Sequence, residues 1–148
     1  MREEQVTKSI LSWLFDRQWK IVCFDFPQSG TGKILHPNES CGEKNKGAII
    51  PDIVAVKDQK CVFFENKDRF FIADYKKQND LKMKNEYSNA IKSLLDRYDV
   101  QYIYYGIGLP ACKHTKRSRE SSVLVDFILT VAEDKNVHVA YDVKEIFV

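Results

Sequence analysis

The sequence predicts an α/β fold in which a central mixed β-sheet carries helices on both faces. Segments with apolar residues at helical spacing alternate along the chain with short runs of β-branched and aromatic residues. Two of these runs, 49–56 and 60–67, are apolar on both faces, as is typical of central strands. The chain has 148 residues, 44% of them hydrophobic and 30% charged. We therefore expect one domain, 1–148, with a single hydrophobic core.

The first half of the chain predicts one helix and three strands. Apolar residues recur at helical spacing over 3–18 and predict a helix there. Its apolar stripe consists of Val6, Ile10, Trp13 and Leu14. The three strands are expected over 20–26, 49–56 and 60–67. Residues 27–47 are rich in Gly, Asn, Ser, Pro and Lys and predict a long loop, which in a compact domain is usually functional or mobile.

The second half predicts two helices and two strands. One face of 75–98 is apolar at helical spacing, and 121–133 is also predicted to be helical. Residues 101–109 are rich in aromatic and β-branched residues and predict a strand, with a last strand over 136–143. A basic loop is expected over 113–119. The complete order is α-β-β-β-α-β-α-β.

Charge and cysteine content exclude several classes of protein. The net charge is only +2, so a nucleic-acid partner must be argued from where the charge lies. The sequence shows no secretion signal, and no apolar run approaches the ~20 residues of a membrane span, so we expect a cytoplasmic protein. The four cysteines include no C-x-x-C pair, which disfavours zinc and iron–sulfur sites. Cys23 and Cys61 are expected to be buried free thiols.

Three charged residues stand at one end of an otherwise apolar pair of strands. If Asp58 and Gln59 form the tip of a hairpin, Asp52 faces Glu65 on the neighbouring strand. Lys67 lies two residues beyond Glu65 and therefore shares its face. A three-residue loop would instead shift the register by one and separate the two carboxylates. Asp-Gln is not the favoured two-residue turn, so both registers stay open.

Two neighbouring carboxylates beside a lysine suit a divalent cation. The carboxylates repel and raise each other's pKa unless a positive charge lies between them. Mg²⁺ takes one or two carboxylates, keeps several waters and shares phosphate oxygens with its substrate. A nearby lysine can position or help deprotonate an attacking water, or neutralise charge in the transition state. The alternative is that the three residues only mark where two strands leave the core.

The same residues resemble a known motif. Pro51-Asp52, then twelve residues, then Glu65-Asn66-Lys67 resembles the PD-(D/E)xK motif of the restriction-endonuclease-like nucleases. The order of elements over roughly 1–110 resembles the α-β-β-β-α-β core of that three-layer fold. The resemblance implies a Mg²⁺-dependent endonuclease that hydrolyses DNA phosphodiester bonds, with Mn²⁺ as a substitute metal. It implies that Asp52 and Glu65 bind the metal and that Lys67 is the catalytic lysine.

Further residues are candidates for the same site. Many members of the family carry another acidic residue on the first helix. On a helical wheel Glu3 lies about 45° from the centre of the apolar stripe, whereas Glu4 points away, so Glu3 is the preferred metal ligand. Its alternative role is to complement the helix dipole. Gln78 or Tyr75, at the start of the next helix, could also reach toward the site.

Two basic segments are candidates for DNA binding. The segment 113–119 contains four basic residues and no acid, and it is predicted to contact phosphates. These residues are Lys113, Lys116, Arg117 and Arg119. The 27–47 loop precedes Asp52 and carries groups that could read base edges. They are Lys33, His36, Asn38, Lys44, Asn45 and Lys46. A solvated basic surface is the alternative.

Several functions are compatible with this pattern. The first choice is a sequence-specific restriction endonuclease most similar to a small type II enzyme. Within the same superfamily the alternative is a structure-selective nuclease such as a Holliday-junction resolvase. Both are expected to be homodimers on DNA, because cutting two strands requires two sites. An alternative of another class is a non-catalytic nucleic-acid-binding or regulatory subunit with the same fold.

Overall fold

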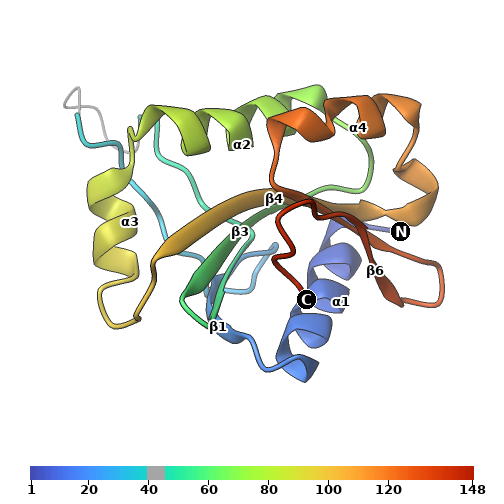
Figure 1. Ribbon diagram of the computed structural model, residues 1–148, viewed down its shortest axis with the longest axis horizontal. Coiled ribbons are helices and arrows are strands. Elements are labelled where there is room, and N and C mark those ends of the chain that lie inside the picture. Colours follow the sequence, from blue (N-terminus) through green and yellow to red (C-terminus); the bar gives the residue numbers. More distant parts are fainter. Residues whose placement is uncertain (40–45) are drawn as a thin grey trace.

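The computed structural model describes residues 1–39 and 46–148, which form an α/β structure of three layers (Figure 1). Within these residues a six-stranded mixed sheet has the order β1-β2-β3-β4-β5-β6. The strands are β1 (Lys20–Phe24), β2 (Ile53–Lys57), β3 (Lys60–Asn66), β4 (Tyr102–Pro110), β5 (Phe127–Val131) and β6 (Val137–Tyr141). The helices are α1 (Glu3–Asp16), α2 (Ile72–Lys84), α3 (Ser88–Leu94) and α4 (Lys116–Glu120), with short 3-10 turns η1 (Ala111–Lys113) and η2 (Ser121–Leu124). The predicted α/β class with a mixed sheet is confirmed.

The direction of the strands divides the sheet into a parallel centre and antiparallel flanks. β3, β4 and β5 run parallel, while β1–β2, β2–β3 and β5–β6 are antiparallel pairs. Parallel strands need a crossover, and the chain between β3 and β4 supplies α2 and α3 for it. No helix in the described part of the chain is long and apolar enough to cross a membrane.

One face of the sheet is covered by α1, as its apolar stripe predicts. Val6, Ile10 and Leu14 are fully buried against Ile53 and Phe64 of the sheet. The C-terminal segment completes the same core. Its Phe147 ring packs against Trp13, Trp19 and Phe127. The helix predicted over 3–18 is confirmed with a shorter end at residue 16.

The opposite face is covered by α2, α3 and α4 (Figure 1). The single helix predicted over 75–98 is wrong, because the chain breaks into α2 and α3 at Asn85. Asn85 adopts the left-handed conformation, with φ 53°, which Asn tolerates better than most residues and which ends a helix. Asn38, from the long loop before β2, hydrogen-bonds to Ser88 and Asn89 at the start of α3. Contacts between segments far apart in the sequence therefore help to fix the break.

The helix predicted over 121–133 is also wrong. Residues 127–131 form β5, which is buried along its whole length between β4 and β6. Its sequence FILTV is apolar without helical spacing and rich in β-branched residues, as expected of a strand covered on both faces. The basic segment predicted as a loop over 113–119 contains the short helix α4.

The hairpin of β2 and β3 has the predicted register. Lys57 pairs with Lys60, and the ladder continues to Ile53 opposite Phe64. Asp58 and Gln59 form the tip with φ angles of 50° and 68°, as a type I′ turn requires. The Gln59 carbonyl accepts the backbone N–H groups of Gln101 and Tyr102, where β4 begins, and these bonds hold the turn in place.

The predicted burial of two cysteines is confirmed. Cys23 and Cys61 are free thiols with 4% and 0% of their surface exposed. Burial raises the pKa of the Cys23 thiol to about 11, which makes it a poor nucleophile near neutral pH. Cys112 is an exposed free thiol, and Cys41 lies outside the described residues.

A buried aspartate links three parts of the fold. Asp126, 3% exposed, precedes β5 and accepts the backbone N–H of Tyr105 on β4 at 2.9 Å. Its other oxygen accepts Lys82 from α2 at 3.3 Å and Lys144 from the C-terminal segment at 2.6 Å. A buried carboxylate requires such partners, because desolvation would otherwise make the charged form unfavourable.

We predict that Asp126→Ala lowers the free energy of unfolding by about 2–3 kcal/mol, because a charge-assisted hydrogen bond is lost and a buried N–H is left unpaired. Urea unfolding monitored by circular dichroism measures this change. Lys144→Ala is the control, since half of that side chain is in water and its removal should cost under about 1 kcal/mol. Equal losses in the two variants would contradict the assignment.

Candidate active site

The candidate site lies where β2 begins and β3 ends. Asp52 directly precedes β2, and its N–H donates to the carbonyl of Phe64 at 3.1 Å. Phe64 is also the partner of Ile53, so the β2 side carries one extra residue here, as in a β-bulge. The Asp52 carboxylate accepts the backbone N–H of Asn66 at 2.7 Å. The end of β3 therefore holds this carboxylate in place.

Glu65 is the second carboxylate of the site. It is only 7% exposed, and its Oε2 accepts the ammonium of Lys77 on α2 at 3.1 Å. Burial and the charge of Glu65 together raise the pKa of Asp52 to about 8. The charge of Glu65 acts on Asp52, so the two carboxylates lie near each other. The ladder ends at Ile53 and Phe64, however, so Asp52 does not pair directly with Glu65 as the register alone predicts.

Lys67 and Glu3 adjoin this pair. The Lys67 ammonium lies 4.0 Å from the Glu3 carboxylate, which belongs to the first turn of α1. Burial acts to lower the pKa of Lys67, but the surrounding carboxylates, led by Glu3, raise it above its usual value. Burial also raises the pKa of Glu3, although Lys67 opposes this effect. Glu3 therefore lies at the same end of the sheet as the predicted motif.

Sequence reasoning missed two charged residues of α2. Lys77 is the ion-pair partner of Glu65, and Asp74 lies one turn before it. Burial and the Glu65 charge raise the pKa of Asp74 to about 6, and its Oδ2 is buried without a hydrogen-bond partner. The i, i+3 spacing of these two residues was a usable signal. The apolar pattern predicts a helix only from residue 75, which leaves Asp74 outside it, whereas α2 begins at Ile72.

Gln78 and Tyr75 have other partners in the structure. The buried Gln78 amide donates to the carbonyls of Phe63 on β3 and Gly106 on β4, at 3.1 and 2.7 Å. The Tyr75 hydroxyl bonds to Ser118 of α4 at 2.6 Å. Both side chains therefore join α2 to neighbouring elements. The sequence suggests that one of them reaches toward the candidate site, but their hydrogen bonds go to other partners.

The two carboxylates at the strand ends have the chemistry of a Mg²⁺ site. In the described part of the chain, no three His, Cys, Asp or Glu residues form a ready-made metal site. Mg²⁺ needs only one or two carboxylates, with water and phosphate oxygens completing its shell. Asp52 and Glu65 fit this requirement, because their mutual repulsion is the kind that a cation between them relieves.

The basic residues on and around α4 are exposed. These are Lys113, Lys116, Arg117 and Arg119. Arg117 lies over the ring of Phe70, at 5.2 Å, in the segment that connects β3 to α2. Lys116 forms an exposed pair with Glu120, and the Arg119 guanidinium donates to the His114 carbonyl. The segment between β3 and α2 contains both Lys67 and Phe70. The contact of Arg117 with Phe70 therefore places the basic segment near the segment that carries Lys67.

Residues of the 27–47 loop have different environments. Lys33, His36 and Lys46 are exposed, while Lys44 and Asn45 lie outside the described residues. Asn38 is tied to the start of α3: its side chain donates to Ser88 at 2.9 Å and accepts the N–H of Asn89 at 3.0 Å. Asn38 therefore positions the loop against α3, and its amide is already hydrogen-bonded within the protein.

Comparisons of the chain with protein-family models, curated proteins and solved structures found no match. The resemblance to PD-(D/E)xK nucleases stays a prediction. It rests on the motif, on the order of the elements and on the arrangement of Asp52, Glu65 and Lys67.

We predict that the contribution of Asp52 to the free energy of unfolding decreases as pH rises from about 4 to about 8. The folded state holds a proton on Asp52 up to its pKa of about 8, whereas the unfolded chain releases it near 3.8. The stabilising contribution of the protonated group is therefore lost over this window. Urea midpoints of wild type and Asp52→Asn should diverge, with the variant relatively more stable at pH 8.

The exposed Asp16→Asn variant is the control, because its difference from wild type should not change in the same way with pH. Parallel pH curves for wild type and Asp52→Asn would show that Asp52 is not the responsible group.

Proposed function

We propose that the protein is a Mg²⁺-dependent endonuclease with a restriction-endonuclease-like fold, which hydrolyses phosphodiester bonds in DNA. The observation that carries the proposal is the convergence of Asp52, Glu65 and Lys67 at the ends of two paired strands. A purely structural role gives no reason to place two repelling carboxylates beside a buried strand end, where desolvation is costly.

Asp52, Glu65 and Lys67 have different roles in the proposed reaction. Asp52 and Glu65 would hold Mg²⁺, which supplies a Lewis acid and a water of lowered pKa when bound. The raised pKa of Lys67 keeps its side chain protonated near neutral pH. The lysine is therefore suited to bind the scissile phosphate and to neutralise charge as the bond to the attacking oxygen forms. Glu3 orients this ammonium from 4.0 Å away.

Lys77 compensates the charge of Glu65 in the metal-free protein. Its ammonium lies 3.1 Å from the Glu65 carboxylate, and a cation at that carboxylate would compete with it. Lys77 has a half-exposed side chain and can turn toward solvent or toward a phosphate of the substrate. This exchange keeps the site close to neutral charge both with and without metal.

The partner in this proposal is DNA, bound by two copies of the protein in the cytoplasm. The exposed basic residues around α4 would contact phosphates, which provides affinity without reading the sequence. Lys33 and Lys46, on the loop before Asp52, would meet the same DNA closer to the grooves.

We predict that wild type nicks or linearises supercoiled plasmid only when Mg²⁺ or Mn²⁺ is present. Asp52→Asn and Lys67→Met should each lower the rate at least about 100-fold, since each removes a group that stabilises the transition state. Gel electrophoresis of plasmid over time measures this rate. Lys84→Met, on an exposed turn of α2, should cut like wild type.

The pattern of products separates the alternatives. Discrete fragments indicate a restriction enzyme, and cleavage restricted to four-way junctions indicates a structure-selective nuclease. An intact plasmid and intact junctions with wild type, at every Mg²⁺ and Mn²⁺ concentration tried, would contradict the nuclease proposal.

We predict that Lys113→Ala/Lys116→Ala weakens DNA binding by about three- to tenfold and flattens its salt dependence, because about two phosphate contacts are lost. Fluorescence anisotropy with labelled duplex, in the Asp52→Asn background to prevent cleavage, measures both quantities. Lys84→Ala is the matched control for the loss of an exposed positive charge. An unchanged salt dependence in the double variant would place the DNA elsewhere.

A further inference from the structure

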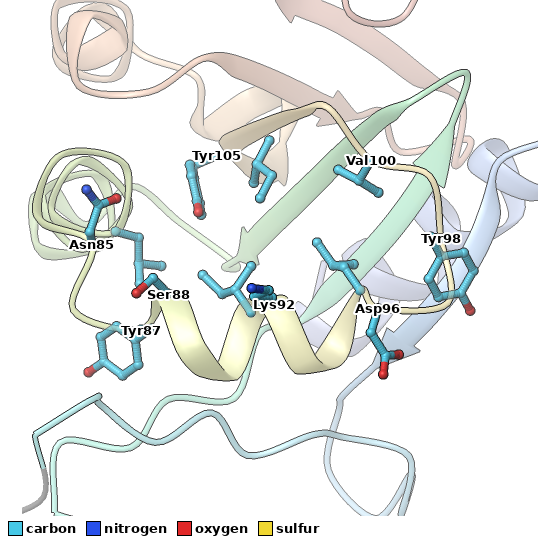
Figure 2. Close-up of a pocket in the computed structure, with 12 residues that line it drawn as sticks. Asn85, Tyr87, Ser88, Lys92, Asp96, Tyr98, Val100 and Tyr105 are labelled. Carbon is cyan, nitrogen blue, oxygen red and sulfur yellow. The ribbon is translucent and has the colours of Figure 1, made fainter.

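A pocket of about 360 Å³ opens between α3, the end of α2 and the sheet (Figure 2). Its walls combine apolar and polar side chains from all of these elements. The apolar residues include Leu81 of α2, Ile91 of α3, Leu95 directly after α3, and Ile103 of β4. The size falls within the range of small-molecule sites, about 300–1,000 Å³. None of the groups assigned to the nuclease site line this pocket.

The hydroxyl of Tyr105 opens into the pocket and has no partner within the described residues. Tyr105 of β4 is 6% exposed, and Figure 2 shows its hydroxyl directed toward α3. Its backbone N–H bonds to Asp126 and its ring packs on Phe63, but its hydroxyl has no hydrogen bond within the described residues. The hydroxyl oxygen is not one of the buried side-chain atoms that lack a partner, so solvent in the pocket reaches it. A ligand in the pocket can therefore form a hydrogen bond with it, which contributes about 0.5–1.5 kcal/mol.

The rim of the pocket combines aromatic rings with groups of both charges. Tyr87 directly precedes α3, and Tyr98 follows its end by four residues; both line the pocket. The Lys20 ammonium lies over the Tyr98 ring at 5.9 Å, so a base would stack on the opposite face of that ring or on Tyr87. Lys92 lies on α3 and Asp96 lies two residues after its end, and neither forms an ion pair within the described part of the chain. Their opposite charges favour a ligand that is neutral overall and carries both donors and acceptors.

We infer that this pocket binds a nucleobase. A base is planar and neutral, has one apolar face on each side, and carries donors and acceptors along its edge. Stacking of a base on an aromatic side chain contributes about 1–3 kcal/mol and tolerates all bases. The Tyr105 hydroxyl meets the edge of the base at the bottom of the pocket, and Tyr87 or Tyr98 provides the stacking surface.

The base has two possible sources, a free nucleoside or a nucleotide turned out of DNA. A neighbouring hollow of about 350 Å³ shares Leu81 and Tyr87 with the pocket and extends to Lys77, the partner of Glu65. DNA held at the candidate active site would therefore approach the pocket. The DNA source rests on the proposed function, while the free nucleoside source does not.

The test is a binding measurement without Mg²⁺, so that it is independent of cleavage. Each common deoxynucleoside is titrated into the protein and followed by the NMR signals of the tyrosine rings. In parallel, fluorescence anisotropy compares a matched duplex with one that carries a single mismatch, whose bases turn out more easily. Tyr105→Phe should weaken binding by about five- to tenfold, because one hydrogen bond is lost while the ring remains.

Tyr102→Phe is the matched control, since Tyr102 lies on the same strand with 54% exposure and outside the pocket. Tyr98→Leu, which removes a ring face, should also weaken binding. Nucleoside binding that depends on Tyr105 supports the inference even if no cleavage is ever seen. A Tyr105 effect confined to mismatched duplex identifies DNA as the source. If no nucleoside binds and Tyr105→Phe binds both duplexes like wild type, the inference is wrong.

Discussion

The pairing of β2 with β3 is the constraint on which the candidate site depends. A two-residue turn at Asp58 and Gln59 fixes the register, and a change of one residue would move Asp52 away from Glu65. Both turn residues have positive φ, which is unfavourable for side chains other than Gly, Asn or Asp. The start of β4 offsets this cost, because its backbone N–H groups bond to the Gln59 carbonyl. The parallel half of the sheet therefore holds the hairpin that carries the site.

This geometry places the carboxylates of Asp52 and Glu65 close enough to repel each other. The folded chain holds Asp52 next to the buried Glu65, and without metal it responds by binding a proton on Asp52 and by pairing Glu65 with Lys77. A divalent cation would replace both the proton and the lysine. Metal binding should therefore be linked to proton release, and the strand ends need not move for it to happen, because Asn66 already fixes the Asp52 carboxylate.

The parts of the fold that could be predicted from the sequence are those set by local patterns. The helix over 3–18 has a clear period, and the turn at Asp58 and Gln59 predicts the ladder of the hairpin as far as Ile53 and Phe64. The irregular bond of Asp52 to Phe64 beyond the ladder was not predictable from the turn. β5 was missed because a short buried run has no period of its own. The break at Asn85 was missed because Asn38, far away in sequence, helps to fix it. The environment of Asp74 depends on where α2 begins, which is the least predictable part of a helix.

The helix α2 joins the separate parts of the molecule. Lys77 pairs with Glu65, and Gln78 at the next position bonds to carbonyls of β3 and β4. Leu81, one turn after Lys77, lines the same pocket as Tyr105. Gln78 is buried and satisfies two strand carbonyls, so a shift of α2 along the sheet would break both bonds. The helix is thus held rigidly between the carboxylates and the pocket.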